Sequence, residues 1–231
     1  MKNLNNTTLI CIDTVQPEEA ILSMIKCMQF FDFARYKFFT DSKSASKNYK
    51  KYDKRIDIID IGDIKNIAQY SEFCLKKLDD YIDTDYCLTV QHDGFIVRPK
   101  LWTDEFLEYD YIGAPWPEHW GYVNRVGNGG FNLKSKKFIS ICKILCKDID
   151  MQTNKIIERG NISVNDDYIS CVTLYKEMLE QGIKYAPVEL AARFSTERIA
   201  RETLEESFGF HEKFTNFTRE AYLEKYIDIA I

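Results

Sequence analysis

Apolar residues in the first 90 positions follow two patterns, short unbroken runs and a spacing of three and four. Short runs bounded by polar residues are typical of buried strands, whereas the three-and-four spacing indicates an amphipathic helix. Pro17 followed by two glutamates indicates a helix start, because proline suits the first helical position and acids suit the first turn. The patterns predict strands at residues 8–12, 36–40, 56–61 and 86–90, with helices after Pro17 and over residues 64–82.

The alternation of strands and helices predicts an α/β fold with a Rossmann-type, mostly parallel sheet flanked by helices on both faces. Ligands of such sheets bind beyond the carboxyl ends of the strands. Gln91, His92 and Asp93 directly follow the strand at residues 86–90, and Gly94 comes next. We therefore expect these three polar side chains at the ligand-binding edge of the sheet.

The second half of the chain is less regular. Residues 110–117 are extended and stiffened by prolines, and residues 126–133 contain three glycines. Helices are predicted over residues 136–146 and 166–181, the second ending at Gly182 because glycine suits the position after a helix. No internal repeat or flexible linker interrupts the pattern, so the chain is expected to form one domain.

Composition narrows the class of protein. The 231 residues are 45% hydrophobic with a net charge of −5, which suits a globular protein and gives little electrostatic reason to bind DNA or RNA. Basic residues gather within positions 43–55, which we interpret as a solvated loop, with weak contact to a membrane surface or anionic partner as the alternative.

The cysteines and the lack of a long apolar run indicate the compartment. Seven cysteines are scattered through apolar segments without a CxxC pair, so they are expected to be buried, reduced thiols. The N-terminus has no signal-peptide core, and no stretch of about 18 apolar residues occurs. A soluble cytoplasmic protein is expected, with a peripheral position at the inner face of a membrane as the alternative.

Asp93, at the end of the fourth predicted strand, is the first candidate for chemistry. A carboxylate held there by a tight glycine turn can bind a divalent metal that bridges two phosphates, since Mg²⁺ and Mn²⁺ prefer oxygen ligands and use few protein groups. The alternative is an ordinary Asp-Gly turn, with His92 as a half-buried ring that makes one hydrogen bond.

Three later features carry similar alternatives. Backbone N–H groups and the amide in Gly127-Asn128-Gly129-Gly130 can approach sugar hydroxyls or a phosphate, or can simply form a tight connection. Asp166 and Asp167 either provide a general base for an acceptor hydroxyl or cap a helix. His211, after an aromatic-flanked glycine, either brings an imidazole to a metal or diphosphate or has only a structural role.

Five stretches, in this order, resemble the GT-A-type nucleotide-sugar glycosyltransferases: QHDGF, FLEYDYIGAPW, VGNGGFNLKSKKF, NDDYIS and SFGFH. The resemblance is closest to a group of small GT-A-like domains long catalogued as a domain of unknown function. It extends from about residue 8 to residue 211. It implies a GT-A-like fold with an irregular, acceptor-side second half.

The resemblance also implies a metal and nucleotide site. The D-x-D element of these enzymes falls on Gln91, His92 and Asp93, and Gln91 departs from the first acid. Metal ligation would then rest on Asp93, completed by His211. The implied cofactor is Mn²⁺ or Mg²⁺.

The implied activity is transfer of a sugar from a nucleotide-diphosphate sugar to a glycan or other hydroxyl acceptor. Residues 1–98 would form the nucleotide-binding half, in which Asp13 either meets the base or ribose or forms a simple strand-end turn. Residues 99–231 would form the acceptor-side half. There Trp116 and residues 128–130 would line the acceptor or sugar site, since aromatic faces suit sugar rings.

The catalytic acid is implied by a later x-E-D element, which falls on residues 165–167 with Asp166 in the glutamate position. Asp166 or Asp167 would then handle the acceptor. The departures at Gln91 and Asp166 support an alternative function, a non-catalytic glycan- or nucleotide-binding module on the same fold.

Overall fold

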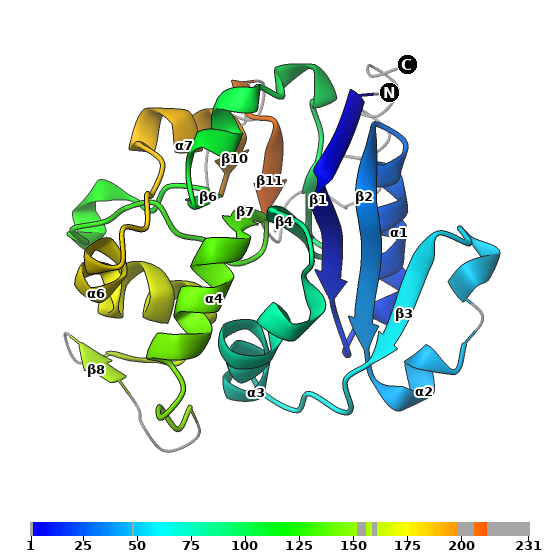
Figure 1. The fold of residues 1–231 in the computed structure, drawn as a ribbon, viewed down its shortest axis with the longest axis horizontal. Helices are drawn as coiled ribbons and strands as arrows, with labels where there is room; N and C mark the ends of the chain where they lie inside the picture. The colour runs from blue at the N-terminus through cyan, green and yellow to red at the C-terminus, as the bar shows by residue number, and fades with distance from the viewer. Residues whose placement is uncertain (1, 48, 152–155, 159–160, 198–205, 212–231) are drawn as a thin grey trace.

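A six-stranded sheet in the order β3-β2-β1-β4-β7-β6 forms the centre of the molecule (Figure 1). The computed structural model describes residues 2–47, 49–151, 156–158, 161–197 and 206–211. The strands are β1 (Lys2–Ile12), β2 (Phe31–Thr40), β3 (Ile56–Asp60), β4 (Tyr86–Val90), β6 (Tyr111–Gly113) and β7 (Asn132–Ser135). β3, β2, β1 and β4 are parallel, whereas β7 is antiparallel to both of its neighbours. The predicted α/β class with a mostly parallel sheet is confirmed.

Helices cover both faces of this sheet. Alternate residues of a strand point to opposite sides, and β1 has apolar residues on both. Leu9 and Cys11 of β1 belong to the core that contains the buried face of α1 (Pro17–Met28). Ile10 and Ile12 point the other way and pack with α4 (Lys136–Leu145) and the helical segment at 67–81. α1 begins at its proline with two glutamates in the first turn, as the sequence predicts.

The helix predicted over residues 64–82 is shorter and changes pitch. α3 (Ile67–Glu72) is capped by Asn66, a π turn follows at Phe73–Lys77, and a 3-10 turn ends at Tyr81. The three-and-four spacing of a regular helix would place Ile67 on the same face as the buried Cys74 and Leu78, but Ile67 is 49% exposed. A change from 3.6 residues per turn moves side chains around the axis, so one regular helical face does not describe the segment.

The helix predicted over residues 166–181 has the same kind of break. It comprises α5 (Asp166–Tyr168), a π turn at Ile169–Thr173 and α6 (Tyr175–Glu180). The spacing of a regular helix that buries Ile169 would also turn Leu179 inward, but Leu179 is 45% exposed and Met178 is fully buried. A π turn adds a residue and shifts the buried face by one position. Gly182 ends the segment with a left-handed φ of 72°, as predicted.

A second, three-stranded sheet lies beyond the end of β4, and the sequence pattern does not predict it. Its order is β10 (Ser195–Thr196), β11 (Gly209–His211) and β5 (Gly94–Ile96). β11 is antiparallel to β5, so His211 is paired with Gly94. The remaining elements are α2 (Ser42–Ala45), α7 (Val188–Phe194), and the hairpin of β8 (Ile156–Glu158) and β9 (Asn161–Ser163).

All seven cysteines are buried and free, as expected. Among the described helices, none is long and apolar enough to cross a membrane.

Candidate functional site

A tight turn links β4 to β5 and carries the predicted strand-end residues. Gln91 N–H donates to the Gly94 carbonyl at 2.8 Å, and Gly94 N–H donates to the Gln91 carbonyl at 3.1 Å. His92 and Asp93, between them, are half-buried. The Gln91 side chain is bound elsewhere, because its Nε2 donates to the Tyr70 hydroxyl at 2.9 Å.

The pairing of β11 with β5 brings His211 to Asp93. The His211 Nε2 lies 3.5 Å from Asp93 Oδ1. The imidazole also lies against the backbone of Gly130, where an added Cβ would stand 2.0 Å from His211 Cδ2. The lack of a side chain at Gly130 therefore leaves room for the His211 ring, which β11 places there.

His92 connects this pair to the end of β1. Its Nδ1 lies 3.2 Å from Asp13 Oδ2, and its Nε2 lies 3.6 Å from Asp93 Oδ2. On the far side, His211 Nδ1 lies 3.6 Å from Glu197 Oε1. Carboxylates and imidazoles thus alternate along a line of five side chains, of which Glu197 had no sequence signal.

The alternation shifts the pKa values of both imidazoles. Interaction with Asp13 raises the pKa of His92. Burial alone would lower the pKa of His211, but its contacts with Asp93 and Glu197 raise that pKa to about 9. Burial opposes ionisation of Asp93, yet the two neighbouring imidazoles lower its pKa below the usual value. At neutral pH the Asp93–His211 pair is therefore a carboxylate beside an imidazolium ion.

A divalent metal fits the Asp93–His211 pair as two of its ligands. Asp93 Oδ1 is a buried acceptor that receives no hydrogen bond from the described residues. Two ligand bonds of about 2.1 Å each can span the 3.5 Å between it and His211 Nε2. The described residues include no group of three or more histidine, cysteine or acidic side chains arranged to hold a metal, so a substrate and water would supply the other ligands.

The glycine-rich loop is held in place by Asn128. Its φ of 67° is left-handed, a conformation that asparagine tolerates better than most residues. Its Oδ1 accepts from the N–H groups of Gly130 at 3.0 Å and Phe131 at 3.3 Å, and its Nδ2 lies 3.1 Å from His211 Nδ1. The Asn128 side chain thus shapes the loop and contacts His211, and the residue is only 2% exposed.

Trp116, expected to line the acceptor or sugar site, lies against this loop as a buried ring. Trp116 is 6% exposed, and a Cβ on Gly127 would lie 2.0 Å from its Cη2, so the loop backbone covers the ring. Half-buried rings lie next to it instead. Tyr122 contacts Trp116, Trp120 and Tyr168 at centroid distances of 5.4, 5.8 and 5.7 Å.

The acids at the start of α5 meet the same loop. Asp167 Oδ2 accepts from Gly129 N–H at 2.7 Å, and its Oδ1 accepts from Tyr168 N–H at 2.7 Å. Burial and the neighbouring Asp166 raise the pKa of Asp167 to about 6. Asp166 faces inward, where its Oδ2 lies 3.6 Å from Lys134 Nζ. The loop therefore stands between the Asp93–His211 pair and the two acids.

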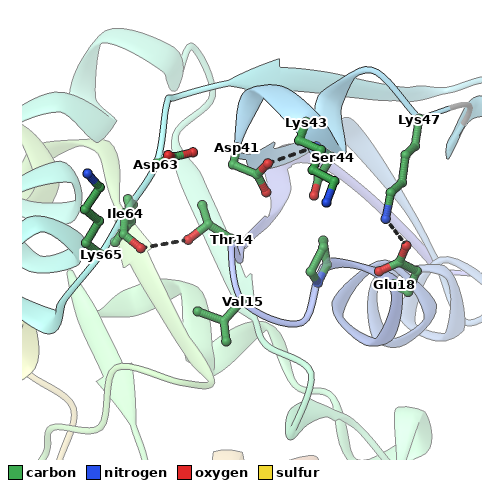
Figure 2. A pocket seen from close by; sticks show the side chains of 11 residues that line it. Thr14, Val15, Glu18, Asp41, Lys43, Ser44, Lys47, Asp63, Ile64 and Lys65 are labelled. Atoms are coloured by element: carbon green, nitrogen blue, oxygen red, sulfur yellow. Dashed lines mark hydrogen bonds and ion pairs between the residues drawn. The ribbon is translucent and has the colours of Figure 1, made fainter.

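A cleft of 430 Å³ opens beyond the carboxyl ends of β1, β2 and β3, where ligands of such sheets bind (Figure 2). Asp13 shapes one wall, because its Oδ1 accepts from the N–H groups of Val15 at 2.8 Å and Gln16 at 2.6 Å. Thr14 Oγ1 donates to the Ile64 carbonyl and ties two of the loops together. The cleft is lined by Thr14, Val15, Pro17, Glu18, Asp41, Lys43, Ser44, Lys47, Asp63, Ile64 and Lys65.

Part of the basic segment at residues 43–55 therefore faces this cleft. Lys43 and Lys47 line it, and Lys47 forms an ion pair with Glu18 across the rim (Figure 2). Arg55 is paired with Asp53 and Asp32.

Solved structures similar to this one include glycosyltransferases of the GT-A type. The apo-form glycosyltransferase GlyE of Streptococcus pneumoniae TIGR4 matches with a TM-score of 0.54 and 13% identity, over 95% of this chain and 60% of GlyE. An active-site mutant of LgtC matches at 0.53 and 16%, over 97% and 95% of the two chains. A glycosyltransferase involved in glycosylation of the PBCV-1 major capsid matches at 0.52 and 11%, over 99% and 100%.

The chain belongs to the DUF5672 family, described as proteins of unknown function, whose model matches residues 54–211. No curated protein matches the sequence. The predicted resemblance to small GT-A-like domains is thus confirmed, and the likeness to the solved structures shows the fold alone. This chain spans 60% of the length of GlyE.

Proposed function

We propose that this protein is a glycosyltransferase that moves a sugar from a nucleotide-diphosphate sugar to a hydroxyl acceptor. The observation that carries the proposal is the meeting of Asp93 and His211, 3.5 Å apart, at the carboxyl end of β4 in a GT-A-like fold. The cleft beside Asp13 and the acids behind the glycine-rich loop lie at the same edge of the sheet.

The cleft is the proposed place for the nucleoside. Its 430 Å³ falls in the range of about 300–1,000 Å³ that small-molecule pockets occupy. Asp13 accepts from the N–H group of Val15, which lines the cleft, and it also contacts His92, which in turn contacts Asp93. A nucleoside in the cleft would thus extend its diphosphate toward Asp93.

Asp93 and His211 would hold Mn²⁺ or Mg²⁺. The bound ion would neutralise the charge that develops on the leaving diphosphate. His211 must lose its proton to ligate, and its pKa of about 9 makes that proton a competitor of the metal.

Asp166 or Asp167 would receive the proton of the acceptor hydroxyl. The acceptor oxygen forms a bond to the anomeric carbon as the bond from that carbon to the diphosphate oxygen breaks. The electron pair of the broken bond stays with the nucleoside diphosphate, and the proton stays on the aspartate. The half-buried rings of Trp120, Tyr122 and Tyr168 are the aromatic faces proposed for the acceptor.

Titration of nucleoside diphosphates, with and without Mn²⁺, tests the proposal. We expect the melting temperature to rise with ligand only when Mn²⁺ is present, and that rise to be lost in Asp93→Asn and His211→Ala. Asp57→Asn and His119→Ala are matched controls, because both residues are exposed and neither belongs to the cluster. Transfer from a panel of nucleotide sugars then identifies the donor, and no turnover with any of them would refute an enzymatic role.

One observation favours a second candidate, a binding module without turnover. Gln91 stands where the family pattern has its first acid, and its side chain donates to Tyr70 instead of facing Asp93. Metal-independent binding of a nucleotide with no hydrolysis or transfer would support this module.

A further inference from the structure

Lys134 of β7 is a buried lysine that the proposed function does not use. Its side chain is 7% exposed, as is that of Asp166, and Lys134 Nζ lies 3.6 Å from Asp166 Oδ2. Burial alone would lower the pKa of Lys134, but Asp166 raises it well above its usual value. The other groups that act on this lysine are the buried thiols of Cys74, Cys87 and Cys142. Lys134 therefore keeps its charge in the interior, beside the carboxyl group of Asp166.

Asp167 is placed differently, although it is the next residue. It is half-buried, and its two carboxylate oxygens accept from the N–H groups of Gly129 and Tyr168. The titratable groups that act on it are Asp166 and Glu197, and it in turn acts on Tyr111 and Cys171. Asp167 has no lysine or arginine partner within 4.0 Å among the described residues.

We propose that Lys134 is a positioning residue: it holds Asp166 in a buried ion pair and thereby leaves Asp167 as the carboxylate that takes the acceptor proton. This inference rests on the proposed function and assigns roles within the same site. A proton on Asp166 would leave the ammonium of Lys134 buried without a counter-ion, which is costly. A proton on Asp167 leaves that pair intact.

The electrostatics of Asp167 agree with this assignment. A general base works best when its pKa lies near the operating pH, and burial and Asp166 raise the pKa of Asp167 to about 6. Lys134 limits that rise because its charge offsets the charge of Asp166.

Carboxyl ¹³C NMR of aspartate-labelled protein tests the pair without any substrate, with Asp167→Asn used to assign the signal. Lys134→Met leaves Asp166 uncompensated, so the Asp167 midpoint should rise by about half a pH unit or more. Asp166→Asn removes the neighbouring charge, so the midpoint should fall by a similar amount, and Lys134→Arg should leave it in place. An unchanged Asp167 midpoint in both Lys134→Met and Asp166→Asn would overturn the inference. If Lys134→Met does not fold, an unchanged midpoint in Asp166→Asn, with Lys134→Arg as the control, would overturn it.

Transfer kinetics supply the second test, once a donor is known. Asp167→Asn should lower kcat by about 10²-fold or more at nearly unchanged donor affinity. Lys134→Met combined with Asp166→Asn makes the interior neutral and should lower kcat much less than Asp167→Asn does. If that double variant is as inactive as Asp167→Asn, Asp166 is the base. A wild type that transfers no sugar would refute the proposed function, whereas the NMR result bears on the ion pair alone.

Discussion

Gly130→Ala is the sharpest perturbation of the Asp93–His211 pair. The new Cβ would stand 2.0 Å from His211 Cδ2, whereas ordinary contact begins at 3.4 Å, so the ring must move by about 1.4 Å. A shift of that size away from Asp93 would lengthen the 3.5 Å separation beyond the ~4.2 Å that two ligands of one ion span. We expect Mn²⁺ affinity, measured calorimetrically with a nucleoside diphosphate present, to fall about tenfold or more.

Gly127→Ala is the matched control for this substitution. Gly127 belongs to the same loop, and its Cβ would also stand 2.0 Å from an aromatic ring. That ring is the buried Trp116 and not His211. Both variants should lose stability, by ~1–3 kcal/mol for an overpacked site, and only Gly130→Ala should lose metal directly. If Gly130→Ala binds Mn²⁺ as tightly as wild type while Asp93→Asn does not, His211 is not a ligand and the reasoning fails.

Three further predictions concern the imidazoles. His211 must be neutral to bind a metal, and its pKa is about 9. The apparent Mn²⁺ affinity should therefore rise between pH 7 and pH 9, by up to about tenfold per pH unit. An affinity that does not change with pH would exclude His211 as a ligand. In metal-free protein the charged His211 stabilises the fold, because its pKa of about 9 exceeds that of an unfolded histidine, about 6.5. This contribution is complete below about pH 6.5 and is lost as the pH rises through about 9. The melting temperature of wild type should therefore fall relative to that of His211→Gln between pH 7 and pH 9.5. His92→Phe removes the link between Asp13 and Asp93 and should weaken nucleoside diphosphate binding about tenfold. The control, His119→Phe at an exposed histidine, should bind like wild type. Equal affinity in His92→Phe and wild type would show that the link has no role in binding.

The sheet and the position of its ligand-binding edge could be predicted from the sequence because both depend on local periodicity. Short apolar runs gave the parallel strands, and the polar residues after β4 could be placed at the carboxyl edge without knowledge of tertiary contacts. The meeting of Asp93 with His211 was implied only by the family resemblance. The pairing that produces it joins two three-residue strands, which are too short to leave a periodic signal.

The remaining parts of the site depend on contacts that composition does not reveal. Glu197 and Lys134 act through partners distant in sequence, and Lys134 stands in a short strand of mixed apolar and polar residues, so its burial has no clear signal in the sequence. Trp116 was expected to line the acceptor or sugar site, but how far an aromatic ring is exposed depends on the chain that crosses it, here at Gly127. The π turns displaced Leu179 from the face that regular periodicity gives.

The pairing of β11 with β5 also has a consequence for how related chains can change in length. The register of this pairing places residue 211 opposite residue 94. A slip of one residue turns every side chain of a strand to the other face, so a single insertion or deletion within Gly94–Ile96 or Gly209–His211 would remove the imidazole from Asp93. A substitution of similar volume at the paired Phe95 or Phe210 changes no chain length and would preserve the alignment. Evolution of this site should therefore tolerate changes of side chain in these strands far better than changes of length.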